Sequence, residues 1–285
     1  MSRRPGLPAG VLTALALVAF AGNSLLCRLA LRAGAIDPAS FTSLRLASGA
    51  LVLALLLRGR GAPGAPAPSW RPAAALAGYA IPFSFAYVAL PAGTGALLLF
   101  GAVQVTMLAS SLRGGERHHP RQWLGALIAL GGLLYLLLPG LAAPPLGSAA
   151  LMLLAGIAWG AYSILGRGAT DPLAATATNF ARAVPVALLA SALTLTSFTA
   201  SLPGVLLALA SGAIASGLGY VIWYAALPRI SRLTASLVQL AVPVLTALAG
   251  VLLLGESLTP RLLLAGTLVL GGIALGVLAP RARAA

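Results

Sequence analysis

Ten apolar runs divide the chain, and each is long enough to cross a bilayer as a helix. A transmembrane helix needs about 20 mostly apolar residues, and the runs lack the short alternating segments of a membrane-spanning β-barrel. The pattern therefore predicts an all-α membrane protein with ten transmembrane helices. The runs cover residues 8–28, 39–57, 73–91, 93–111, 122–139, 147–166, 172–197, 203–227, 232–254 and 260–279.

Composition agrees with a membrane location. Hydrophobic residues make up 60% of the chain and charged residues 8%, with a mean hydropathy of +1.00. Such a chain has too few polar groups to cover a water-exposed surface. The run 8–28 is too long for the apolar region of a cleaved signal peptide and has no small-residue cleavage site before the next run. We therefore expect it to remain as the first helix.

The second half of the chain repeats landmarks of the first. GERHHPRQWLGALIALGG at 115–132 returns as GESLTPRLLLAGTLVLGG at 255–272, an offset of 140 residues with eight of eighteen positions identical. Because each half holds an odd number of helices, the second copy must enter the membrane from the opposite side. The sequence therefore predicts two inverted five-helix repeats, 1–140 and 141–285. Such repeats place a substrate site at their interface, near the bilayer midplane.

The net charge of +14 includes 18 arginines, whose positions indicate an orientation in the membrane. With the N-terminus inside, thirteen lie in cytoplasmic segments and three lie outside, which follows the positive-inside rule. We therefore expect both termini to be cytoplasmic and expect no nucleic-acid partner. The cytoplasmic set is Arg3, Arg4, Arg58, Arg60, Arg71, Arg113, Arg117, Arg121, Arg167, Arg229, Arg232, Arg281 and Arg283, and the outside set is Arg28, Arg32 and Arg261.

Polar and aromatic residues inside the apolar runs are the candidate substrate contacts. Trp159, Tyr162 and Ser163 follow helical spacing on the sixth run, and Asn23 and Ser24 occupy the matching face of the first. Polar groups facing lipid would lack partners, so these faces should either line a wet cavity or bond neighbouring helices. The candidate cavity residues are Asn23, Ser24, Tyr79, Phe83, Phe100, Gln104, Trp159, Tyr162, Ser163, Tyr220, Gln239 and Pro243.

The aromatic residues have alternative roles in core packing or at the membrane surface. Aromatic residues at helix ends are usually interface anchors, and we expect this role for Tyr87 and Tyr224. Tyr79, Phe83 and Tyr220 lie deeper in their runs and suit the walls of a site for a medium-sized amphipathic solute.

Two arginines, Arg45 and Arg182, fall inside apolar runs. An arginine in hydrocarbon requires a counter-charge, carbonyl groups, water or snorkelling to the interface. We expect Arg45, near the start of the second helix, to snorkel outward. For Arg182 we favour helix packing or snorkelling over contact with a substrate carboxylate. The midplane is therefore expected to carry little positive charge.

The four acidic residues lie at predicted membrane boundaries. Intramembrane carboxylates are the usual proton relays of coupled pumps, so this placement favours facilitated transport over proton antiport. We expect Glu116 and Glu256 to help cap the fifth and tenth helices, which begin near Pro120 and Pro260.

The chain has few residues of the types that usually carry out catalysis. His118 and His119 are the only histidines, Cys27 is the only cysteine, and no phosphate-binding loop, zinc-hydrolase pair or nucleophilic serine motif occurs. We expect no metal, no cofactor and no enzyme activity. A membrane-embedded lipid-modifying enzyme and a nonspecific channel are the competing classes.

Taken together, the landmarks resemble the EamA-type branch of the drug/metabolite transporter superfamily. The resemblance rests on Asp37-Pro38 and Asp171-Pro172, on the aromatic and serine pairs Phe20/Ser24 and Trp159/Ser163, on Pro243 ahead of Gly255-Glu256, and on the Gly-Gly endings. It implies a ten-helix carrier of the bacterial inner (plasma) membrane with a central cavity, usually an exporter of amino acids or related metabolites. The first half departs from the pattern, because Val103 stands at the position that matches Pro243.

The expected function is export of small metabolites by alternating access around a central cavity. The aromatic, weakly polar candidate faces favour amino acids, large apolar or aromatic ones above all, over anionic nucleotide sugars. Export of lipophilic drugs or other metabolites is the alternative. The expected partners are the small-molecule substrate and the lipid bilayer. The oligomeric state is open, and a monomer is plausible because one chain contains both repeats.

Overall fold

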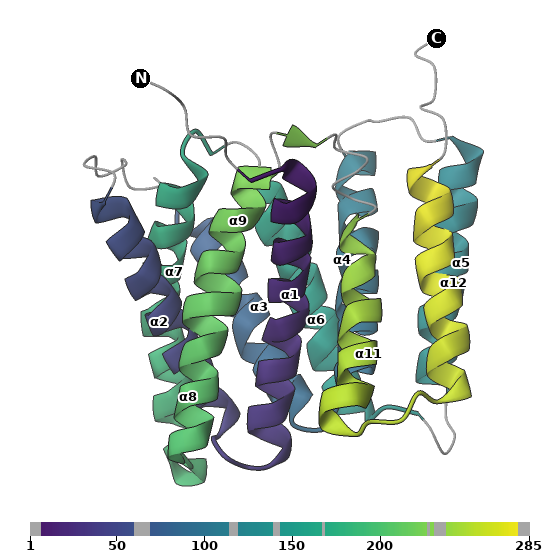
Figure 1. The fold of residues 1–285 in the computed structure, drawn as a ribbon. Coiled ribbons are helices and arrows are strands. Elements are labelled where there is room, and N and C mark those ends of the chain that lie inside the picture. Colours follow the sequence, from purple (N-terminus) through teal and green to yellow (C-terminus); the bar gives the residue numbers. More distant parts are fainter. Residues whose placement is uncertain are drawn as a thin grey trace.

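The computed structural model describes residues 7–59, 69–113, 119–138, 143–166, 169–226, 229–230 and 238–278, and within these ranges the chain is a bundle of helices (Figure 1). Its elements are α1 (Ala9–Arg32), α2 (Pro38–Arg58), α3 (Arg71–Tyr87), α4 (Ala92–Arg113), α5 (Pro120–Leu137), α6 (Leu146–Gly166), α7 (Pro172–Leu193), η1 (Leu195–Ser197), α8 (Leu202–Ala210), the π-helix η2 (Ser211–Leu218), α9 (Gly219–Ala226), α11 (Ala241–Leu254) and α12 (Pro260–Val277).

The predicted all-α membrane class is confirmed. Among the described residues, seven helices are long and apolar enough to cross a membrane, and two shorter apolar helices accompany them. The described ranges contain no strand beyond an isolated bridge between Ile36 and Ala200. The predicted run 203–227 is one continuous passage through α8, η2 and α9, and part of the run 232–254 lies outside the described residues.

Local signals at the helix starts explain where several helices begin. Asp37 accepts hydrogen bonds from the backbone N–H groups of Ala39 and Ser40, and Asp171 caps α7 in the same way. Each is followed by a proline, whose missing N–H costs nothing in the first turn. His119 caps α5 and Thr259 caps α12.

The expected capping role of Glu256 at the last helix is wrong. Its carboxylate accepts a hydrogen bond from the Ala92 N–H at 2.7 Å, at the start of α4, because the loop before α12 folds back over that helix end. Glu116 lies outside the described residues.

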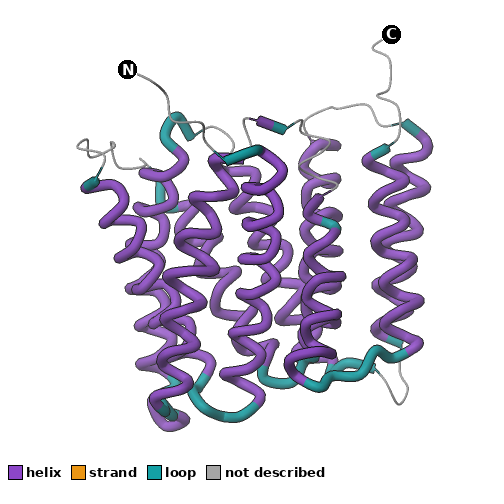
Figure 2. The backbone as a smooth tube through the Cα atoms, viewed as in Figure 1, coloured by secondary structure: helices purple, strands orange, loops and turns teal. Residues whose placement is uncertain are grey.

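Helices from the two halves of the chain pack in pairs. α5 packs against α12, α2 against α7 and α4 against α11. α3 contacts α6, and α1 in the same way contacts the α8–η2–α9 passage. α1 begins and α12 ends at the same end of the bundle, the top in Figure 1, and loops gather at both ends in Figure 2. The boundary predicted at 140/141 lies outside the described residues.

Glycines in the repeated stretch bring its two copies together. A Cβ added to Gly125 in α5 would lie 2.3 Å from the backbone oxygen of Gly272 in α12, and one added to Gly272 would lie 2.5 Å from that of Gly125. Small residues let membrane helices approach closely where no hydrophobic force drives them together. The duplicated stretch is therefore a helix-packing surface.

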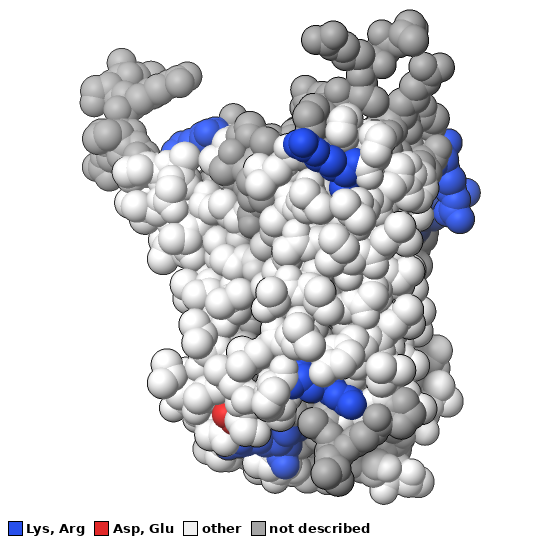
Figure 3. Space-filling view, turned by 90° about the vertical axis from the view of Figure 1, so that its right-hand side faces the viewer, with Lys and Arg blue, Asp and Glu red and all other residues white. Residues whose placement is uncertain are grey.

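The outer surface has the character of a lipid-facing belt. In Figure 3 the arginines gather toward the two ends of the bundle, with a broad uncharged zone between them. Leu193 is 77% exposed and Leu252 is 81% exposed. Apolar side chains on that belt replace the polar surface that a water-soluble protein would need.

Candidate functional site

A cavity of about 30 Å³ lies within the bundle and is bordered by both halves of the chain. A buried water needs roughly 10–15 Å³ by this measure, so the cavity has room for about two waters. Its lining combines aromatic rings with a few polar side chains. The lining residues are Phe20, Asn23, Ser24, Arg45, Tyr79, Phe83, Leu99, Phe100, Trp159, Ala215, Ser216, Tyr220 and Gln239.

Arg45 is the centre of a buried hydrogen-bond network. Its Nε donates to Ser216 Oγ at 3.2 Å, and its Nη2 donates to the Tyr79 hydroxyl at 2.9 Å. Asn23 joins the network by donating from Nδ2 to the Tyr79 hydroxyl at 3.3 Å. The Asn23 Oδ1 accepts from Ser211 at 2.7 Å and from Ser216 at 3.5 Å. Side chains from four segments of the chain, α1, α2, α3 and η2, thus join one network around the Arg45 guanidinium.

The expectation that Arg45 snorkels outward is wrong. Arg45 is the eighth residue of α2, and its side chain is only 1% exposed. It shares the buried face of the helix with Thr42, Leu46 and Gly49, at helical spacing. That face turns toward the bundle, so the guanidinium reaches the cavity. The cavity lining thus carries one positive charge.

Aromatic rings form the rest of the wall. The Tyr79 ring lies 4.9 Å from the Trp159 ring and 5.2 Å from the Phe83 ring, centroid to centroid. Trp159 also contacts Tyr220 at 5.4 Å, and Tyr220 contacts Phe20 at 6.0 Å. These separations suit tilted and edge-to-face packing, in which rings pack without a strict sandwich.

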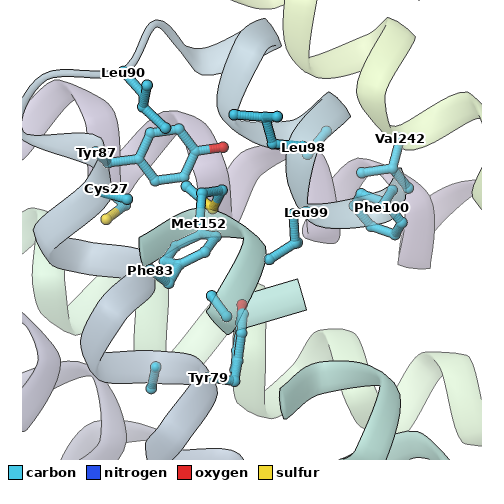
Figure 4. Packing of buried hydrophobic residues seen from close by; sticks show 14 of the residues in the cluster. Cys27, Tyr79, Phe83, Tyr87, Leu90, Leu98, Leu99, Phe100, Met152 and Val242 are labelled. Carbon is cyan, nitrogen blue, oxygen red and sulfur yellow. The ribbon is translucent and has the colours of Figure 1, made fainter. Parts of the chain in front are cut away.

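Tyr87 is not an interface anchor, contrary to expectation. Figure 4 shows it in line with Tyr79 and Phe83 along α3, and it is fully buried. Its hydroxyl donates to the Ala92 backbone oxygen at 3.3 Å, and a Cβ added to Gly95 would lie 2.4 Å from its ring. A helix-end tyrosine is buried here because the turn into α4 covers it. The side chain of Tyr224 lies outside the described residues.

Several candidate residues lie outside the cavity lining. Tyr162 is buried against the Trp159 ring at 5.4 Å, and the Ser163 hydroxyl donates to the Trp159 backbone oxygen at 2.8 Å within the same helix. Gln104 is partly buried on α4, and Pro243 is buried on α11. The cavity thus draws on Trp159 but not on the polar groups that follow it in α6.

Arg182 contacts residues just before the start of α3, and these residues do not line the cavity. Its Nη1 donates to the Ser69 backbone oxygen at 2.9 Å, and its guanidinium lies 5.0 Å from the centre of the Trp70 ring. This geometry fits the helix-packing interpretation better than contact with a substrate.

Ser211 was not among the residues predicted from the sequence, because it lies in a π-helix, where different positions share a face. In an α-helix, positions five apart face different directions. In η2, whose backbone bonds run from i to i+5, Ser211 and Ser216 both reach Asn23 Oδ1. The only sequence signal is the pair of Ser-Gly steps, Ser211-Gly212 and Ser216-Gly217, five residues apart.

An ion pair lies at the end of the bundle opposite the start of α1. Arg28 Nε lies 2.9 Å from Glu256 Oε1, with side chains 14% and 12% exposed. The Arg28 Nη1 also donates to the Tyr87 and Val88 backbone oxygens at 3.0 and 2.9 Å, and Arg32 donates to the Leu254 backbone oxygen. These contacts tie α1 to the α3–α4 turn and to the loop before α12.

The described residues hold no group of three or more His, Cys, Asp or Glu side chains placed to bind a metal ion. The cavity lining described above also contains no carboxylate and no imidazole. Its polar side chains are amides, hydroxyls and one guanidinium, which bind polar solutes by hydrogen bonds and charge.

Comparison with known proteins finds similarity to a protein family, to a bacterial protein and to a solved structure. Residues 146–278 match the model of the EamA-like transporter family. An uncharacterized protein of Pseudomonas aeruginosa is 60% identical over 276 residues, which cover 95% of this chain and 94% of that protein. A solved crystal structure shares the fold with a TM-score of 0.66 at 23% identity, over 94% of this chain and 96% of its own.

Proposed function

The chain belongs to the EamA-like transporter family and is a multi-pass membrane transporter of small molecules, and from that premise we propose that it exports amino acids. Large apolar and aromatic amino acids are the favoured substrates. The proposed location is the bacterial inner membrane with both termini cytoplasmic, as the arginine distribution predicts.

The observation that supports an amino-acid substrate is the combination of polar groups and aromatic rings in the cavity lining. Arg45, Asn23 and Ser216 supply hydrogen-bonding groups, and Trp159 and Tyr220 supply rings. A zwitterion needs polar groups at one end and an apolar wall for its side chain, and an aromatic face also attracts an ammonium group. The lining thus supplies groups of both kinds for such a solute once the cavity widens.

Alternating access is the proposed mechanism because the cavity is too small for an amino acid in this conformation. With room for about two waters, a cavity of about 30 Å³ requires helix separation before a substrate enters. We propose that the Arg28–Glu256 pair, at the end of the bundle opposite the start of α1, helps to hold that end closed. We propose that the two repeats rock against each other around the cavity, which lies between them.

Transport is proposed to be facilitative. The cavity lining among the described residues has no carboxylate or imidazole that could act as a proton relay. Membership of a transporter family argues against a lipid-modifying enzyme. The positive charge of Arg45 argues against lipophilic cations as the main substrates.

The test is counterflow in liposomes. Purified protein is reconstituted into vesicles preloaded with unlabelled phenylalanine, and uptake of external labelled phenylalanine is followed with and without a protonophore. We expect saturable counterflow that the protonophore leaves unchanged. Trp159→Ala should lower it at least about tenfold, since stacking and wall contacts are lost. Trp123→Ala is the matched control, because Trp123 is 47% exposed on α5.

The outcomes separate the elements of the proposal. Absence of counterflow with phenylalanine, threonine and cysteine from folded protein would refute the amino-acid assignment. Loss of counterflow on collapse of the proton gradient would refute the facilitative mechanism. An equal loss in both tryptophan variants would remove the cavity from the substrate path.

A further inference from the structure

Arg45 carries a buried positive charge that no described carboxylate balances. Asp37 and Asp171 cap α2 and α7, and Glu256 pairs with Arg28. The protein surrounds the guanidinium instead with the hydroxyls of its network and with two ring faces, at 5.2 Å from the centre of Tyr79 and 5.1 Å from that of Phe83. An unbalanced charge away from water is costly, and burial at such a site commonly marks function.

One end of the guanidinium has no hydrogen-bond partner. Nε and Nη2 of Arg45 both donate within the network, whereas Nη1 is buried and unpartnered. Each Nη atom of arginine carries two N–H groups in a fixed fork that matches a carboxylate. A buried donor left unpaired costs free energy that a bound acceptor recovers.

The network around Arg45 presents donors to the cavity. The Tyr79 hydroxyl accepts from both Arg45 and Asn23, so its own proton is free to be donated. Ser216 accepts from Arg45 and lies within bonding distance of Asn23 Oδ1, which also accepts from Ser211. Asn23 Oδ1, the strongest acceptor near the guanidinium, thus already accepts hydrogen bonds within the network. The donors that remain suit an anion.

We propose that Arg45 binds the carboxylate of the transported solute, and that the site accepts organic monocarboxylates as a class, with or without an α-ammonium group. This inference rests on the proposed transport function and narrows its substrate class. The carboxylate docks on Nη1 and the Tyr79 hydroxyl, and the remainder of the solute packs against Trp159 and Tyr220. A single guanidinium, with no second cation among the described lining residues, fits one carboxylate better than a phosphate ester.

Binding is tested by thermal unfolding of the full-length protein in detergent with paired ligands. The pairs are 3-phenylpropionate with 3-phenylpropionamide and phenylalanine with phenylalaninamide, so that only the carboxylate differs. We expect each acid to raise the Tm at concentrations at least about tenfold lower than its amide requires. Arg45→Gln should abolish that preference. Arg182→Gln, which removes an arginine that contacts Ser69 and Trp70, should keep it.

A second variant covers the case in which Arg45→Gln fails to fold. Tyr79→Phe keeps the ring and removes the hydroxyl donor, and we expect it to weaken the acids several-fold while leaving the amides unchanged. Equal stabilisation by acids and amides, no stabilisation by either acid, or an intact acid preference in Arg45→Gln or in Tyr79→Phe would overturn the inference. Acid-selective binding without phenylalanine counterflow would refute only the transport proposal. Counterflow that the acid and the amide inhibit equally would refute only the role of Arg45.

Discussion

Neighbouring glycines in the repeated stretch provide a test of how α5 packs against α12, because an alanine at each position adds one methyl group. In α12, Gly272 faces α5, and a Cβ there would lie 2.5 Å from the Gly125 backbone oxygen and 2.7 Å from the Ala129 nitrogen. A Cβ on Gly271 meets nothing within 4 Å. The first copy has the same division, since Gly131 is open and a Cβ on Gly132 would lie 2.8 Å from the Leu268 Cβ.

The expected magnitudes follow from these contacts. An alanine in an open helical position is about 1 kcal/mol better than glycine. Overpacking costs about 1–3 kcal/mol, and more where the opposing atoms are backbone and cannot rotate away. Gly272→Ala should therefore be less stable than Gly271→Ala by about 2–4 kcal/mol. For a chain of this size that corresponds to a Tm difference of roughly 5–10 °C.

The assay is thermal unfolding of the four single variants in detergent, with monodispersity checked by size exclusion. Gly132→Ala and Gly272→Ala should fall below the parent protein, and Gly131→Ala and Gly271→Ala should match or exceed it. If Gly271→Ala proves as damaging as Gly272→Ala, the packing of α5 on α12 is not as described. If only one copy shows the difference, the two helices are not equivalent packing partners.

Three further predictions concern the bundle end, the network and the cavity. Glu256→Gln should lower the free energy of unfolding by about 1–3 kcal/mol. A double-mutant cycle with Arg28→Gln should show a coupling energy above about 0.5 kcal/mol, and additive effects would contradict the ion pair. Gly212→Ala should lower both the Tm and the counterflow rate, because its Cβ would lie 2.1 Å from the Arg45 backbone oxygen. Gly22→Ala is the control and should be neutral, because a Cβ at Gly22 has no neighbouring atom within 4 Å. The half-saturation concentration for counterflow should be constant from about pH 6 to pH 8, since none of the described lining side chains is a carboxylate or an imidazole; a titration in that window would contradict a facilitative site.

The helices and their ends follow from residues close together in sequence. Apolar runs near 20 residues predicted the passages through the membrane, and Asp37 and Asp171 begin α2 and α7 as their Asp-Pro steps indicate. These features were accessible because hydropathy and capping act within one helix. The repeated Gly-Gly endings marked related helices, although only the structure shows that they meet.

Which way a side chain faces is decided by the neighbours of its helix. Hydropathy predicted Arg45 at an interface and Tyr87 as an anchor, but both are buried because other helices cover those faces. Glu256 binds Arg28 and the start of α4, which lie 228 and 164 residues away along the chain. Nothing in the local pattern at these positions distinguishes lipid from protein interior, since both surroundings are apolar.

The sequence by itself thus determined that the chain spans a membrane as helices, and it predicted that the two halves are related. Only the tertiary structure placed Arg45, Asn23 and Ser216 around one cavity, with η2 turning Ser211 into the same network. The physical reason is that helix formation in lipid depends on satisfying the backbone within each segment. The site depends on contacts between segments far apart in the chain.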